Sequence, residues 1–176
     1  MNMSQIRGAP AIASLAALSV ASHLSIALET SPPPEFLTSP EALKNYVQPI
    51  LDYLYTARPT AVNLGAATRR LTKTLHAGVD AGRDAVSIAR DLAAEGKAID
   101  DEDVSRNRLM SKWGAEWLLK EVEKKGKPAE GLQVMTVCNT GSLATSVSDY
   151  GVTYSLFYPT VVSGLWNRVG SYHPST

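Results

Sequence analysis

Cysteine is almost absent from this sequence, with one copy, Cys138, in 176 residues. A single cysteine excludes an intramolecular disulfide framework and any zinc site built from several cysteines, and it favours a reducing compartment. Net charge is also absent, because 17 lysines and arginines balance 17 aspartates and glutamates. We therefore expect neither nucleic acid nor an anionic membrane as a partner, although one or two arginines suffice to bind a small anion.

The sequence also lacks a long uninterrupted apolar run. Residues 9–28 come nearest, but serines and His23 dilute the segment, and Pro10 lies where a helix would begin. A membrane span needs roughly 20 mostly apolar residues, and a secretory signal peptide carries a purer apolar segment. We expect instead a cytoplasmic protein, with the nucleus left open as a second location, and a buried helix over residues 11–28. Its small side chains would let another element pack closely: Ala13, Ala16, Ala17 and Ala21.

Helical periodicity dominates the residues that follow. The prolines in SPPPEFLTSP, residues 31–40, exclude regular structure there and predict a surface connection. Ser39 before Pro40 is typical of a helix N-cap and first turn. The predicted helices cover residues 40–55, 61–75, 82–94 and 100–124. The first of these presents one apolar face made of Leu43, Val47, Ile50, Leu51 and Leu54. The last is expected to bury Met110, Trp113, Trp117, Leu118 and Val122.

One segment has the character of a strand, LQVMTV at residues 132–137, which is short, apolar and bounded by a glycine-containing turn and the loop CNTGS. We therefore predict a mainly α chain with a small α/β part. A helical N-terminal domain would cover residues 1–130, and residues 131–146 would form the first strand and loop of an incomplete Rossmann-like domain. Residues 147–176 are an atypical, aromatic-rich tail.

Three short segments combine a reactive or anion-binding side chain with backbone suited to close approach. Arg7 and Arg58 each lie just before a predicted helix start, where a guanidinium and free amides together suit an oxyanion. Taken alone, each segment is more often an ordinary helix start with a solvated arginine. Cys138 ends the strand, where open α/β sheets bind ligands. Its thiol is a candidate nucleophile or general acid or base, or else a small buried apolar side chain.

Taken together, the three segments resemble the methylthioribose-1-phosphate isomerase family. IRGAPAI, RPTAVNL and VCNTGSLAT occur in the family's order, and EDVSRNRLMSKWGAEWL resembles the family's helix before the cysteine strand. The resemblance implies an aldose–ketose isomerase that converts 5-methylthioribose 1-phosphate to 5-methylthioribulose 1-phosphate in methionine salvage. It further implies no cofactor, no metal, a small phosphorylated sugar as substrate, and the homodimer typical of full-length members.

The resemblance also implies residue roles. Cys138 would be one of two catalytic acid–base residues. The substrate-binding residues would be Arg7, Gly8, Ala9, Arg58, Asn139, Thr140 and Gly141. The family's second catalytic group is a downstream aspartate, but Asp149 is the one carboxylate after Cys138, and its surroundings, SVSDYGV, do not resemble that motif. We therefore expect a truncated form with little or no turnover.

Two other readings stay open. The family is related to the regulatory subunits of the exchange factor for translation initiation factor 2, so a non-catalytic regulatory role is one alternative. An unrelated helical interaction module is the other. Cys138 with intact RGAP and CNTG segments favours the enzyme. The sequence after Ser146 departs from the family's glycine-rich loop, which suggests a shifted reading frame or exon boundary that a transcript sequence would test.

Overall fold

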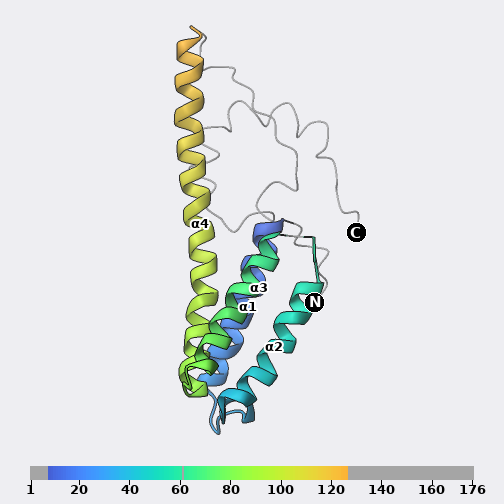
Figure 1. Cartoon of the computed structure of the whole chain (residues 1–176). Helices are drawn as coiled ribbons and strands as arrows, with labels where there is room; N and C mark the ends of the chain where they lie inside the picture. The colour runs from blue at the N-terminus through green and yellow to red at the C-terminus, as the bar shows by residue number, and fades with distance from the viewer. Residues whose placement is uncertain (1–7, 61, 127–176) are drawn as a thin grey trace, which may run out of the picture. The chain divides into compact units, whose positions relative to one another are not determined.

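The structure, a computed structural model, describes residues 8–60 and 62–126, which are mainly helical. In chain order the elements are α1 (Ala9–Glu29), the short 3-10 helix η1 (Glu35–Leu37), α2 (Pro40–Thr56), α3 (Val62–Asp80) and α4 (Ala85–Lys124) (Figure 1). The described residues belong to two compact units, one up to Val104 and the other from Ser105. No strand lies within the described ranges, and the predicted strand at 132–137 and both predicted domain boundaries fall outside them.

The prediction that residues 31–40 lack regular structure is wrong at η1, a single 3-10 turn after the prolines. The predicted start of α2 is confirmed, and α2 ends at Thr56, one residue beyond the predicted end. Ser39 is the N-cap, and its Oγ accepts a hydrogen bond from the Ala42 amide at 3.0 Å. This bond satisfies one of the amides that a helix start leaves without an intrahelical partner. The predicted break at Pro59 is also present, because α2 ends at Thr56 and α3 begins at Val62.

The residue predicted to begin the next helix, Gly82, instead ends α3. Its φ of 65° is left-handed, a conformation that glycine adopts without steric cost. The Gly82 amide donates to the Val79 carbonyl at 2.9 Å, and the Arg83 amide donates to the Gly78 carbonyl at 3.1 Å. These two bonds form a Schellman motif, which satisfies carbonyls at a helix end. Gly82 therefore marks a helix boundary, as predicted, but it follows the end of α3 and does not begin the next helix.

Asp84 then opens α4 as its cap. The carboxylate accepts from the Ser87 amide at 2.9 Å and from the Ser87 hydroxyl at 2.6 Å. These two hydrogen bonds, that of the hydroxyl first, lower the pKa of Asp84 below its ordinary value of 3.8.

The prediction of separate helices at 82–94 and 100–124 is wrong, since α4 is continuous from Ala85 to Lys124. The residues left between the two predicted helices, 95–99, include Gly96, and glycine disfavours helix interiors. Packing overrides that preference at Gly96. A Cβ atom there would lie 2.6 Å from the Ala17 carbonyl oxygen and 2.9 Å from the Ala21 Cβ, so only glycine admits this approach of α1.

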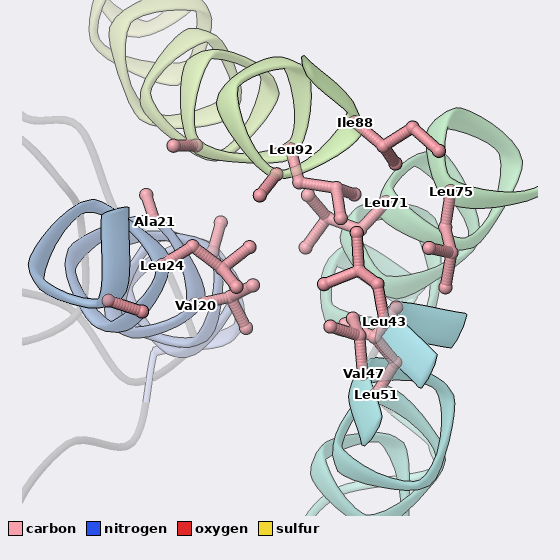
Figure 2. Packing of buried hydrophobic residues seen from close by; sticks show 14 of the residues in the cluster. Val20, Ala21, Leu24, Leu43, Val47, Leu51, Leu71, Leu75, Ile88 and Leu92 are labelled. Carbon is pink, nitrogen blue, oxygen red and sulfur yellow. The ribbon is translucent and has the colours of Figure 1, made fainter. Parts of the chain in front are cut away.

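The core of the first unit lies among all four helices (Figure 2). Side chains of α1, α2, α3 and α4 point toward one another, and the largest of them are almost fully buried: Leu24, Leu43, Leu51, Leu71, Leu75, Ile88 and Leu92. The predicted face of α2 is confirmed at Leu43, Val47 and Leu51, whereas Ile50 and Leu54 are half-buried. The predicted role of small residues is confirmed at Ala17 and Ala21, which meet Gly96.

Helix α1 is long and apolar enough, by length and composition alone, to cross a membrane. We had expected its serines to make it too polar for that. Half of its most apolar stretch is buried in the protein. Ala17, Ala21 and Leu24 are each at most 1% exposed. A helix that is apolar on most of its circumference is also what a protein interior requires.

The buried side predicted for the helix at residues 100–124 is wrong in part. Met110, Trp113 and Trp117 are 61%, 60% and 63% exposed. Val122 is buried, as predicted, and Leu118 is half-buried. Both lie on the other side of the helix from the tryptophans at 100° per residue. The described part of this segment therefore has one covered apolar side and one apolar side that faces solvent.

Candidate functional site

The start of α1 contains two of the predicted substrate-binding residues, Gly8 and Ala9. Gly8 is the buried N-cap, with extended backbone and no side-chain cap, and its carbonyl accepts from the Ile12 amide at 3.0 Å. Pro10 occupies the first turn, where its missing amide hydrogen costs no hydrogen bond. The first-turn amides of a helix have no intrahelical acceptor, and the helix dipole gives them partial positive charge.

A small apolar cluster joins this helix start to two distant segments of the chain. Ile12 and Ala16 of α1 are buried against Leu64 of α3, and Ala9 and Leu54 pack on the same cluster. Leu54 lies in the last turn of α2, and Leu64 in the first turn of α3. Figure 1 shows the corresponding arrangement, in which α1 and α3 begin, and α2 ends, at one end of the unit. The cluster thus brings together the starts of α1 and α3, each of which carries a partial positive charge.

Arg58 lies in the connection between α2 and α3, four residues after Leu54 and six before Leu64. Its side chain is half-buried. Because Leu64 belongs to the cluster and Leu54 packs on it beside Ala9, the connection that carries Arg58 lies at the same end of the unit as Gly8 and Ala9. Of the predicted site residues, the structure therefore collects these three at one place.

A further arginine at this end was missed by the sequence analysis. A Cβ atom on Gly65 would lie 3.0 Å from Arg69 Nη1 and 3.1 Å from Tyr55 Cε2, so the absent side chain leaves room for both. Arg69 extends back along α3 toward its start and is exposed. The spacing of Gly65 and Arg69 could have predicted this contact, since residues four apart share a helix face. With Arg58 it adds positive charge near two helix starts, a combination suited to a phosphate group.

The neighbouring Arg70, by contrast, is part of the fold. Its Nε donates to Glu95 at 2.6 Å, and Nη1 and Nη2 donate to the two oxygens of Glu102 at 2.7 and 3.0 Å. The hydrogen bond to Glu102 raises the pKa of Arg70 above its ordinary value; partial burial opposes this, and the hydrogen bond to Glu95 reinforces it. This fork ties α3 to α4, so Arg70 is already engaged by carboxylates.

The remaining predicted site residues lie outside the described ranges. They are Arg7, Cys138, Asn139, Thr140 and Gly141. Their positions and roles therefore stay predictions. Among the described residues, no group of three or more histidine, cysteine, aspartate or glutamate side chains is arranged to hold a metal ion.

Comparison with known proteins gives the family. Residues 5–155 match the Initiation factor 2 subunit family, a stretch that includes all three motifs and the helical unit. The chain belongs to this family. Proteins similar to this chain include the methylthioribose-1-phosphate isomerase of Laccaria bicolor, which is 63% identical over 153 residues. These residues cover 86% of this chain and 40% of the relative.

Two further relatives bear the same name. The methylthioribose-1-phosphate isomerase of Postia placenta is 62% identical over 152 residues, covering 86% of this chain and 39% of the relative. That of Cryptococcus neoformans var. neoformans serotype D is 46% identical over 142 residues, covering 81% of this chain and 35% of the relative. The chain thus spans about two fifths of the length of the first two relatives. The family resemblance drawn from the motifs is confirmed.

Proposed function

We propose that this chain supplies the helical sugar-phosphate-binding part of an aldose–ketose isomerase that acts on 5-methylthioribose 1-phosphate. The observation that carries the proposal is the cluster of Ile12, Ala16 and Leu64, which brings the starts of α1 and α3 to one end of the unit. The connection bearing Arg58 lies at this end. The names of the relatives supply the reaction class.

The chemistry divides between binding and proton transfer. A phosphate dianion would accept hydrogen bonds from helix-start amides and from a guanidinium, and charge-assisted hydrogen bonds of this kind are the stronger ones. Isomerisation moves a hydrogen between the first two sugar carbons, so it needs a group that takes and returns a proton near each of them, or one that stabilises a transferred hydride. We assign one of these steps to the Cys138 thiol. The chain offers no carboxylate after Cys138 except Asp149. We therefore propose binding with little or no turnover by these 176 residues.

Binding of 5-methylthioribose 1-phosphate, measured by isothermal titration calorimetry, tests the proposal. Arg58→Ala should weaken binding by roughly tenfold or more, as expected for a charged hydrogen-bond partner, and Arg58→Lys should restore part of the loss. Arg83→Ala is the matched control, because Arg83 follows the opposite end of α3 and pairs with Asp91. Equal binding by all the variants would contradict the proposed site.

Turnover is measured separately by following ketose formation with NMR. We expect little or none. Turnover that disappears in Cys138→Ser would establish an active isomerase and overturn the proposed lack of activity. Absence of both turnover and binding would favour the non-catalytic alternative, a regulatory protein of the same family.

A further inference from the structure

Tyr55, in the last turn of α2, is an exposed aromatic residue beside the candidate site. Its side chain is 41% exposed, although the preceding residue, Leu54, packs on the small apolar cluster. Leu64 of α3 belongs to the same cluster, and Gly65 follows it. Tyr55 and Gly65 therefore each lie about 100° around their helices from a residue that faces the cluster. This places the Tyr55 ring at the end of the unit that carries Arg58.

The ring packs over Gly65. A Cβ atom on this glycine would lie 3.1 Å from Tyr55 Cε2 and 3.7 Å from Cδ2. The same Cβ atom would lie 3.0 Å from Arg69 Nη1, so the ring and the guanidinium meet at one point on α3. A larger residue at position 65 would displace one or both of them. The absent side chain thus keeps an apolar ring and a positive charge side by side.

The positive charge of Arg69 is not used by the fold. Within residues 8–60 and 62–126 no carboxylate pairs with its side chain, which is exposed. The next residue, Arg70, differs, because two carboxylates of α4 bind it. Arg69 is therefore available to an anion from solution, and the Tyr55 ring beside it is available to an apolar group.

A second exposed apolar side chain lies on the same face of α3. Val62, the first residue of this helix, is 78% exposed. It precedes Gly65 by three residues and Arg69 by seven, a spacing that places all three on one helix face. The face therefore runs from an apolar residue to a charged one, with the Tyr55 ring over the glycine between them. Such a surface suits a ligand that carries both an anion and an apolar group.

The ligand of the proposed function, 5-methylthioribose 1-phosphate, has this divided character. Its phosphate is an anion, and the methylthio group at the other end of the sugar is apolar. Thioether sulfur packs favourably against aromatic rings, and burial of the methyl group removes apolar surface from water. A hydroxyl group in the place of the methylthio group would lose hydrogen bonds to water against the same ring. An aromatic residue at this position would therefore distinguish the two groups.

We propose that Tyr55 determines the specificity of the sugar-phosphate site, because its ring packs against the methylthio group while Arg58 and Arg69 bind the phosphate. This inference rests on the proposed function, since it names the residue that selects the ligand of the same site. Without the ring, the site still binds a phosphorylated sugar through its arginines and helix starts, but it no longer favours a thioether over a hydroxyl.

Calorimetric titration of the full chain with two sugars tests the inference: 5-methylthioribose 1-phosphate and ribose 1-phosphate, which carries a hydroxyl in place of the methylthio group. The wild type should bind the methylthio sugar about tenfold more tightly. Tyr55→Ala should reduce this preference to about threefold or less, through weaker binding of the methylthio sugar, and should leave the Kd for ribose 1-phosphate within about twofold. Tyr55→Phe should keep the preference, because the ring makes the contact and the hydroxyl does not.

Tyr53→Ala is the matched control. Tyr53 is 76% exposed on the same helix but lies about 200° around it from Tyr55, so its loss should leave the preference unchanged. Circular dichroism checks that each variant retains its helices. Equal binding of the two sugars by the wild type, or a preference that Tyr55→Ala leaves intact, would overturn this inference and leave the proposed function standing. Absence of binding to either sugar would instead contradict the proposed function, and this inference with it.

Discussion

The two described parts of α4 follow the same apolar periodicity and reach opposite outcomes. In the first unit Ile88 and Leu92 are fully buried, at 0% exposure. In the second, Trp113 and Trp117 are spaced just as regularly and are about 60% exposed. Helical spacing therefore shows that a face is apolar, but it does not show that another segment covers it. Coverage depends on partners that are distant in sequence or belong to another molecule.

Truncation of side chains in the two regions should produce the largest contrast. Leu71→Ala removes a side chain that is 1% exposed, and it should lower the free energy of unfolding by about 2–5 kcal/mol. Leu119→Ala, at 44% exposure, should change it by about 0.5 kcal/mol or less. Urea denaturation measures both. Similar losses in the free energy of unfolding for the two variants would mean that the difference in burial between the two regions has no effect on stability.

The two glycines within α4 should give effects of opposite sign. Gly96→Ala forces a methyl group against the Ala17 carbonyl oxygen, at 2.6 Å, and should destabilise the protein by about 1–3 kcal/mol. Gly114→Ala meets no atom within 4 Å, so the higher helix propensity of alanine should stabilise this part of α4 by up to about 1 kcal/mol. Thermal unfolding followed by circular dichroism compares them. A stabilising Gly96→Ala would contradict the close packing of α1 on α4.

The smallest effect concerns pH. The pKa of Asp84 is lower in the folded protein than its ordinary value of 3.8, because the Ser87 hydroxyl and amide donate to the carboxylate. Its stabilising contribution is therefore complete above about pH 4 and is lost as the pH falls through the folded-state pKa. Asp84→Asn keeps a capping side chain that does not titrate, so the urea midpoint should depend less on pH below about 4.

Ser87→Ala provides the complementary measurement. Without the hydroxyl, the pKa of Asp84 should rise toward its ordinary value, and the pH dependence should move toward that of Asp84→Asn. Identical pH profiles for the wild type and both variants would show that the cap contributes nothing to the acid limit of stability.

Much of the helical unit could be predicted from local sequence. Ser39 with Pro40 fixed the start of α2, and Pro59 fixed its separation from α3, since both signals act through the backbone of neighbouring residues. The predicted break at residues 95–99 was wrong because Gly96 within it packs on Ala17, which is 79 residues away in the chain. The prediction that Trp113 and Trp117 are buried failed for the same reason, because burial depends on which distant segment packs on that face.

The candidate site was predictable in its parts but not in its assembly. The Arg58 and Gly8 segments were recognised from their motifs and from helix-start chemistry. Their proximity rests on Ile12, Ala16 and Leu64, apolar residues that no local rule connects. Arg69 was missed because its relevance comes from the space left by Gly65.

The small cluster of Ile12, Ala16 and Leu64 also links ligand binding to folding. Because the helix starts and the Arg58 connection lie together only while α1, α2 and α3 are packed, the unfolded chain has no equivalent site. An anion that binds there must stabilise the folded unit by an amount that grows with the logarithm of its concentration. The melting temperature of the whole unit thus becomes a measure of what is bound at one of its ends.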